Sequence, residues 1–366
     1  MSLSSLRIMD FRNLKNVDLA LCRNGFNLIG GNNGSGKTSL LEAIHYLGLG
    51  RSFRSSNLSS LIRHTTSKFS IFVQLILDND GVIPIGTERT LEGLVRMRVS
   101  EKDVSKLTEV ASFLPIRVIN SQSHHLFESG PIFRRKYLDW GLFYQSNQFL
   151  SCWQSFERAL KQRNVILRSR RRTKEYETWT HELIKHASVL DHFRREYINQ
   201  LSPYLKESAS ALLDISQPEI LYSPGWDQKQ EYATILFEDE EEEFRLGHTL
   251  SGPHRADVDI RINGVLAKHF LSRGQQKLLI CGMIIAQGKL FTKQANKGLI
   301  YLIDDLPSEL DLESRRKLIS VLVEQQTQIF VTAIEEQPIL DLIKNGDVPN
   351  KVFHVEQGDV SERGSR

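Results

Sequence analysis

The 366-residue chain is 40% hydrophobic and 25% charged, the balance of a globular protein with a sizeable core, and its formal net charge of +3 does not by itself indicate a nucleic-acid partner. Its three cysteines (Cys22, Cys152 and Cys281) are widely spaced, which argues against a zinc site or a disulfide framework. No apolar run approaches the ~20 residues of a membrane span, and the N-terminus lacks a secretory signal pattern. We therefore predict a cytoplasmic protein with no membrane partner.

Short β-strands are predicted in the first third of the chain. The patterns at 6–10, 17–21 and 26–30 indicate strands, with turn residues at Asn13 and Asn24. A further strand over 69–77 ends at a hairpin signal, Asp78-Asn79-Asp80-Gly81, and another is predicted over 116–120. A helix is predicted to begin near Ser39.

The most specific motif of the chain follows the strand predicted over 26–30. It reads Gly31-Asn32-Asn33-Gly34-Ser35-Gly36-Lys37-Thr38-Ser39 and matches the P-loop pattern G-x-x-x-x-G-K-[ST] between a strand and a helix. The glycines let backbone N–H groups turn toward phosphates, and the helix N-terminus adds partial positive charge. Lys37 can then reach the β- and γ-phosphates of a nucleoside triphosphate, and the Thr38 hydroxyl can ligate Mg²⁺.

A helical region with few glycines is predicted from about Phe133 to Leu213. We predict that this insertion, lobe II (131–213), lies between two halves of an α/β lobe I (1–130 and 214–366). The range 158–174 holds eight Lys or Arg residues and no acid. Its densest part, the basic cluster, consists of Arg168, Arg170, Arg171, Arg172 and Lys174. The acidic run 238–243 is interpreted as a solvated loop.

Two carboxylates end an apolar strand predicted in the last part of the chain. Residues 299–303 look like a buried parallel strand, whose carboxyl end is where ligands bind in α/β sheets. Asp304 is therefore predicted to hold Mg²⁺, directly or through water, beside Thr38. Asp305 is the candidate to orient or deprotonate the attacking water.

The segment Leu271-Ser272-Arg273-Gly274-Gln275-Gln276 resembles the LSGGQ signature of ABC-type ATPases. Ser272, Gly274 and Gln275 are candidate contacts to the nucleotide bound by a second subunit, and an ordinary Ser cap of the helix 273–290 is the alternative. Ser308-Glu309-Leu310-Asp311 has the spacing of the D-loop, which makes Asp311 a candidate across the same interface. Thr332 ends the next predicted strand, where transporters place a histidine.

In this order, the motifs resemble the RecF family of recombination and repair ATPases, which is related to the heads of SMC proteins. The more specific segments are Arg134-Arg135-Lys136-Tyr137-Leu138-Asp139-Trp140, Lys161-Gln162-Arg163-Asn164 and Ser251-Gly252-Pro253-His254-Arg255. The P-loop and the signature are the generic ones, and the set closes with Leu302-Ile303-Asp304-Asp305. The resemblance covers almost the whole chain.

The resemblance implies an α/β fold: a P-loop ABC-type ATPase head with additional antiparallel β-structure, a helical insertion and no long coiled coil. It also implies ATP-driven head-to-tail pairing of two subunits that clamp gapped or duplex DNA near single-strand junctions. Slow hydrolysis would release the clamp. RecR would be the partner, with RecO acting in the same pathway to load RecA on gapped DNA. ABC enzymes usually carry Glu where this chain has Asp305, consistent with slow turnover. Gln122 is the nearest candidate for the Q-loop.

The basic cluster is the candidate DNA contact, with a solvated helix face or loop as the alternative. No aromatic residues interleave with the cluster and no base-reading motif is found, so DNA binding would not depend on the DNA sequence.

His254 and Arg255 are interpreted as packing residues rather than catalytic ones. Four other functions fit the sequence less well. A structural tether like the SMC proteins would need a heptad run for a coiled coil, and the ATPase subunit of a transporter would carry a switch histidine; this sequence shows neither. A nucleotide kinase would have no use for the signature segment, and a nuclease would need a second carboxylate cluster.

Overall fold

The computed structural model describes residues 1–215, 217–295, 297–305, 310–344 and 348–363. Its contacts divide the chain into two compact units, 1–123 with 296–366, and 124–295. The second unit is larger than the predicted lobe II (131–213). It includes the strands and the long helix of residues 219–295, because they pack with the helices of the insertion.

A mostly parallel sheet in the first unit carries the P-loop. Its strand order is β15-β14-β3-β13-β12-β8. The ranges are β3 Phe26–Gly30, β8 Ile116–Ile119, β12 Ile300–Ile303, β13 Gln328–Ala333, β14 Asn350–Glu356 and β15 Asp359–Arg363. The apolar runs that predicted β3 and β12 are fully buried. The carboxyl ends of β3, β12 and β13 meet at one edge, which brings Gly31, Asp304 and Thr332 together.

An antiparallel sheet lies in the same unit, in the order β2-β1-β4-β5-β6-β7. Its strands are β1 Ser2–Phe11, β2 Leu14–Ala20, β4 Lys68–Ile76, β5 Val82–Thr90, β6 Val95–Val99 and β7 Lys102–Val104. The predicted hairpin after residue 77 joins β4 to β5. Three short helices connect these elements: η1 Leu58–Leu61, α2 Leu107–Phe113 and η2 Ser121–His124.

Helix α1 (Lys37–Leu49) follows the P-loop and is buried along most of its length. It ends at Gly50, which adopts a left-handed conformation (φ 61°) and donates its N–H to the Tyr46 carbonyl. Helices α12 (Leu312–Val323) and α13 (Gln337–Lys344) complete the first unit.

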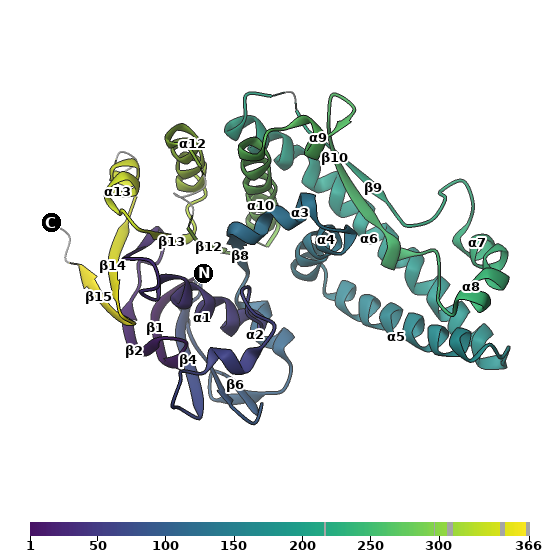
Figure 1. The fold of residues 1–366 in the computed structure, drawn as a ribbon, viewed down its shortest axis with the longest axis horizontal. Helices are drawn as coiled ribbons and strands as arrows, with labels where there is room; N and C mark the ends of the chain where they lie inside the picture. Colours follow the sequence, from purple (N-terminus) through teal and green to yellow (C-terminus); the bar gives the residue numbers. More distant parts are fainter. Residues whose placement is uncertain (216, 296, 306–309, 345–347, 364–366) are drawn as a thin grey trace. The chain divides into compact units, whose positions relative to one another are not determined.

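The second unit is built on long helices, as the helical pattern predicted. Helices α4 (Pro131–Gln145), α5 (Asn147–Ser169) and α6 (Lys174–Leu212) pack with α10 (Arg273–Ala295), and α5 and α6 run side by side (Figure 1). A small sheet has the order β11-β10-β9, from Val265–Leu266, Asp257–Ile262 and Glu219–Ser223. The short helices are α3 His125–Glu128, α7 Tyr232–Glu238, α8 Glu240–Leu246, η3 Pro253–Arg255 and α9 Ala267–Phe270.

The interpretation of the acidic run 238–243 as a solvated loop was wrong. Residues 240–243 form the first turn of α8, where carboxylates favour a helix N-terminus. Glu243 is fully buried and pairs with the equally buried Arg163 of α5, at 2.6 Å. Glu243 therefore holds α8 against α5. Its partner Arg163 is distant in sequence, so the local sequence gave no sign of this pair.

Two histidines, the buried His45 and the partly buried His254, make stability depend on pH. Burial lowers the pKa of His45 to about 4, and that of His254 to about 4. His45 Nδ1 lies 2.8 Å from the Arg51 carbonyl, and His254 Nε2 lies 3.1 Å from the Thr249 carbonyl. Both rings are thus neutral in the folded chain and become charged on unfolding below the ordinary pKa of about 6.5.

We expect the free energy of unfolding to be fully retained above pH ~6.5 and to fall toward pH ~4, by up to ~3 kcal/mol for each histidine. Urea unfolding at several pH values between 7.5 and 5 measures this slope. His45→Gln keeps a side-chain donor but cannot titrate, so its slope should be shallower. Identical slopes for His45→Gln and the unchanged chain would contradict this assignment.

Candidate nucleotide-binding site

The P-loop backbone depends on its glycines. Gly31, Gly34 and Gly36 adopt positive φ angles of 146°, 76° and 125°, which favour glycine. At Gly31 a side chain would also collide with the Val355 carbonyl. The loop closes with a 3.2 Å hydrogen bond from the Ser35 N–H to the Asn32 carbonyl.

The Lys37 side chain folds over this loop from the first turn of α1. Its Nζ donates to the carbonyls of Gly31 (2.7 Å) and Asn32 (2.9 Å). Burial lowers the pKa of the Lys37 ammonium, and the charges of Asp305 and Asp304 oppose that shift. The ammonium therefore lies at the loop with two carboxylates close enough to stabilise its charge.

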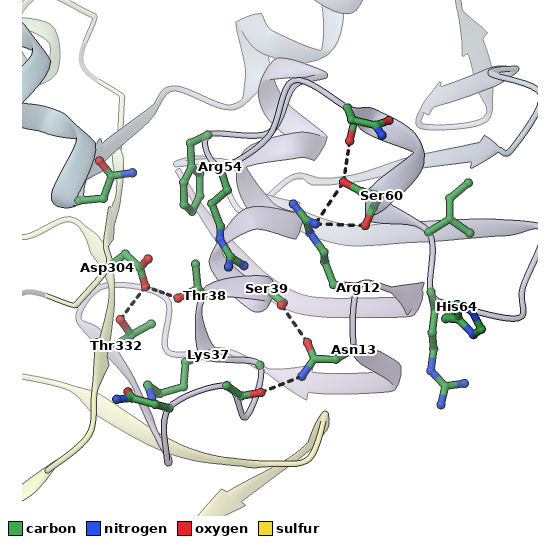
Figure 2. Close-up of a pocket in the computed structure, with 18 of the residues that line it drawn as sticks. Arg12, Asn13, Lys37, Thr38, Ser39, Arg54, Ser60, His64, Asp304 and Thr332 are labelled. Atoms are coloured by element: carbon green, nitrogen blue, oxygen red, sulfur yellow. Dashed lines mark hydrogen bonds between the residues drawn. The ribbon is translucent and has the colours of Figure 1, made fainter.

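Thr38, Asp304 and Thr332 form a hydrogen-bonded group at the edge of the sheet (Figure 2). The hydroxyls of Thr38 and Thr332 both donate to Asp304 Oδ1, each at 2.9 Å. Burial raises the pKa of the Asp304 carboxyl, and these two hydrogen bonds oppose the rise. Thr332 also accepts the Asp305 N–H at 2.8 Å, so it fixes both aspartates.

The group suits a magnesium ion. Mg²⁺ prefers oxygen ligands at 2.0–2.1 Å in an octahedron, in which neighbouring ligands are about 2.9 Å apart. The Thr38 and Asp304 oxygens are separated by 2.9 Å. Asp305 adopts a left-handed backbone (φ 55°) directly after Asp304, and its side chain is exposed toward the adjacent cleft.

An open cleft of about 1170 Å³ lies along the P-loop in the first unit. Besides the P-loop, it is lined by the segment 53–66 and by Gln122, Asp304, Asp305 and Thr332. Gln122 follows β8 in the short helix η2, so the candidate Q-loop residue does face this cleft. The lining thus combines hydroxyl, amide and carboxylate groups with the Lys37 ammonium, and the site fits a nucleoside triphosphate with Mg²⁺.

The other sequence-predicted nucleotide contacts lie elsewhere in the described structure. Ser272 and Gln275, in the second unit, form a reciprocal cap on α10: the Ser272 N–H donates to Gln275 Oε1 (3.0 Å) and the Gln275 N–H to Ser272 Oγ (3.4 Å). Gly274 lies between them in the first turn. Asp311 caps α12 by accepting the Ser314 N–H at 2.8 Å. Ser308 and Glu309 of the predicted D-loop lie outside the described residues.

The basic cluster surrounds the turn between α5 and α6. Arg170 ends α5 in a left-handed conformation, Lys174 begins α6, and all five residues of the cluster are exposed. Arg172 pairs with Glu240 at 3.6 Å and with Glu241, both on α8. Part of the cluster's positive charge is therefore balanced by the acidic run.

Two further groups of residues escaped the sequence analysis. Asn13, predicted only as a turn residue, donates from Nδ2 to the Ser35 carbonyl (2.9 Å) and accepts from the Ser39 hydroxyl (2.9 Å). Glu42, fully buried on α1, accepts two hydrogen bonds from Arg12, at 2.9 and 2.8 Å. Glu42, an acidic residue one helical turn beyond Thr38, was the sequence signal available for the second group. A single asparagine in a turn, such as Asn13, carries no such signal.

Comparison with known proteins first defines the class. Residues 2–361 match the RecF/RecN/SMC N terminal domain family. The solved structure of the recombination mediator protein RecF-ATP has a TM-score of 0.87 at 23% identity, covering 99% of this chain and 98% of that one. The Smc head domain of Pyrococcus furiosus, bound to the C-terminal domain of ScpA, has a TM-score of 0.59 at 15% identity, covering 99% and 96%. The fold is therefore that of an ABC-type ATPase head of the SMC and RecF class.

The sequence relatives define the family. The DNA replication and repair protein RecF of Shewanella denitrificans is 43% identical over 361 residues, and that of Cellvibrio japonicus is 41% identical over 363, each alignment covering 99% of both chains. The chain belongs to the RecF family of DNA replication and repair proteins, which confirms the resemblance inferred from its motifs. No helix in the described ranges is long and apolar enough to cross a membrane.

Proposed function

We propose that this chain is an ATP-dependent DNA clamp and a weak, DNA-stimulated ATPase of recombinational repair and replication restart. The observation that carries the proposal is the meeting of the P-loop, Thr38 and Asp304 at one edge of the sheet. ATP would lie in the cleft, with its phosphates on residues 31–39 and Mg²⁺ held by Thr38 and Asp304. The bound ion would neutralise charge on the phosphates.

The chain's own residues supply the remaining steps. Lys37 stabilises the phosphate charge from the loop, and Gln122 faces the same cleft. The Asp305 carboxylate, exposed to the cleft beside the partly buried Asp304, orients the attacking water and accepts its proton. The short reach of Asp compared with Glu supports slow turnover, so the clamp would persist before hydrolysis releases it.

A complete site would need a second copy of the chain. Ser272, Gly274, Gln275 and Asp311 would contact the nucleotide of the partner subunit in a head-to-tail homodimer. DNA, whether gapped, duplex or single-stranded, would be bound through its phosphates, with the basic cluster as one contact surface. The RecFOR pathway in which the solved RecF-ATP structure is placed supports RecR as the partner, with RecO in the same pathway. Loading of RecA would be the outcome.

Steady-state ATP hydrolysis over a series of protein concentrations, with and without gapped duplex DNA, tests the proposal. Specific activity that rises with concentration and with DNA is expected, because two subunits complete each site. A rate per subunit that is constant with concentration and indifferent to DNA would overturn the dimeric clamp. Failure of the chain to bind ATP at all would overturn the nucleotide site itself.

Asp305→Asn should separate binding from hydrolysis. The amide cannot accept the water's proton, so the turnover rate should fall by about 10²–10⁴-fold while ATP binding and pairing persist. The measurement is the rate of dissociation from gapped DNA in the presence of ATP, which should become slower than that of the unchanged protein. Dissociation as fast as that of the unchanged protein would exclude Asp305 as the residue that controls release.

A further inference from the structure

The Ser35 carbonyl of the P-loop accepts two hydrogen bonds from outside the loop. The Gly358 N–H donates at 2.8 Å and Asn13 Nδ2 at 2.9 Å. Gly358 lies in the turn between β14 and β15, and Asn13 in the turn between β1 and β2. Donors from opposite ends of the sequence thus converge on one peptide group of the phosphate-binding loop.

These hydrogen bonds fix the orientation of the peptide that joins Ser35 to Gly36. A peptide group is planar and trans, so its C=O and N–H point in opposite directions. Because the carbonyl is held toward the two turns, the Gly36 N–H is held away from them. A P-loop binds phosphate through N–H groups that share an inward orientation, and a donor already oriented costs less ordering on binding.

We propose that Gly358 and Asn13 are positioning residues that pre-organise the P-loop for the triphosphate. This inference rests on the proposed function of the site. Asn13 contacts the P-loop on one side and the helix that follows it on the other, because its Oδ1 also accepts a hydrogen bond from the Ser39 hydroxyl in the first turn of α1 (Figure 2). The C-terminal hairpin β14–β15 thereby becomes part of the nucleotide site without contacting the nucleotide.

The hairpin is held firmly enough to serve this purpose. Strand β14 pairs in parallel with β3, the strand that leads into the P-loop, with His354 opposite Gly30. Arg363 of β15 donates to the largely buried Glu336 carboxylate at 2.8 Å. The sheet therefore fixes where the Gly358 turn meets the loop.

Gly358 offers a variant with a matched control. Its φ is +91°, it is buried, and a Cβ there would collide with the Asn13 carbonyl. Gly264, in the turn between β10 and β11, has a similar φ of +78° but nothing within 4 Å of an added Cβ. Alanine carries a similar backbone penalty at both positions, but only Gly358→Ala forces the β14–β15 turn and the β1–β2 turn apart where both meet the Ser35 carbonyl.

The experiment measures ATP affinity by equilibrium titration with a fluorescent ATP analogue and, in parallel, KM and kcat for hydrolysis. Gly358→Ala should weaken ATP binding by about tenfold or more, whereas Gly264→Ala should bind like the unchanged protein. KM should rise with a smaller change in kcat, because the loop holds the phosphates before and during the reaction. Affinity of the nucleotide-free protein for duplex DNA should not change.

Asn13→Ala, with the exposed Asn16→Ala as its control, tests the second donor independently of the hairpin. Because both donors act on one carbonyl, the loss in the double variant should be smaller than the product of the two single losses. ATP affinity within twofold of the unchanged protein in both single variants would overturn the inference. Absence of ATP binding by the unchanged protein would instead overturn the proposed function.

Discussion

Replacement of Lys37 by alanine should abolish ATP-dependent pairing and reduce kcat/KM for ATP hydrolysis by about 10²-fold or more. Lys37 Nζ already lies at the P-loop, bonded to the Gly31 and Asn32 carbonyls, with the charges of Asp304 and Asp305 nearby. Removing a pre-positioned donor from a site where negative charge develops costs about this much in other enzymes. Light scattering with ATP reports pairing, and phosphate release reports hydrolysis.

The matched control is Lys15→Ala, which removes an exposed lysine from β2 and leaves the cleft intact. It should pair and hydrolyse like the unchanged protein. ATP-dependent pairing in Lys37→Ala equal to that of Lys15→Ala would show that Lys37 is not needed to bind the triphosphate productively.

Asp304→Asn should abolish Mg²⁺-dependent hydrolysis and at the same time stabilise the nucleotide-free protein. Burial raises the pKa of the Asp304 carboxyl, so its charged form at neutral pH reduces folding stability. Asparagine has no charge, and its Oδ1 can still accept from Thr38 and Thr332. The stabilisation should appear as an increase in Tm of about 2–4 °C for each kcal/mol gained, measured by differential scanning calorimetry.

The sign of the pH effect gives a second test of Asp304. A raised carboxyl pKa reduces stability above the folded-state pKa, and that loss disappears below the ordinary value of about 3.9, where both states are protonated. The Tm advantage of Asp304→Asn should therefore shrink as the pH falls. Asp18→Asn, which changes an exposed carboxylate on β2, should show no such advantage at neutral pH. A lower Tm for Asp304→Asn at neutral pH would contradict the assignment.

The candidate nucleotide site was largely predictable from the sequence because its signals are local. The P-loop lies between an apolar strand and a helix in the sequence itself, and Asp304 directly follows a fully buried strand. Parallel pairing of β3, β13 and β12 then brings these segments together. Thr332 was predicted at the end of its strand, but its hydrogen bonds to the two aspartates needed the sheet order.

What the sequence analysis missed depends on contacts between distant segments. Glu243 looks like one acid among many until Arg163 is placed opposite it in the interior. Gly358 contributes a backbone N–H, which every residue except proline carries, so no residue type could mark it. The extent of the second unit was also underestimated, because the strands 219–223 and 257–262 pack with helices that precede them in the chain.

The order of strands in the parallel sheet also bears on how the chain folds during synthesis. Strand β3 is made early, yet its neighbours β13 and β14 are residues 328–333 and 350–356. The P-loop strand must therefore wait for both of its sheet neighbours until the ribosome has made nearly all the rest, including the whole of 124–295. A truncated nascent chain would thus hold the Lys37 motif but no assembled nucleotide site, and it would be a natural substrate for chaperones.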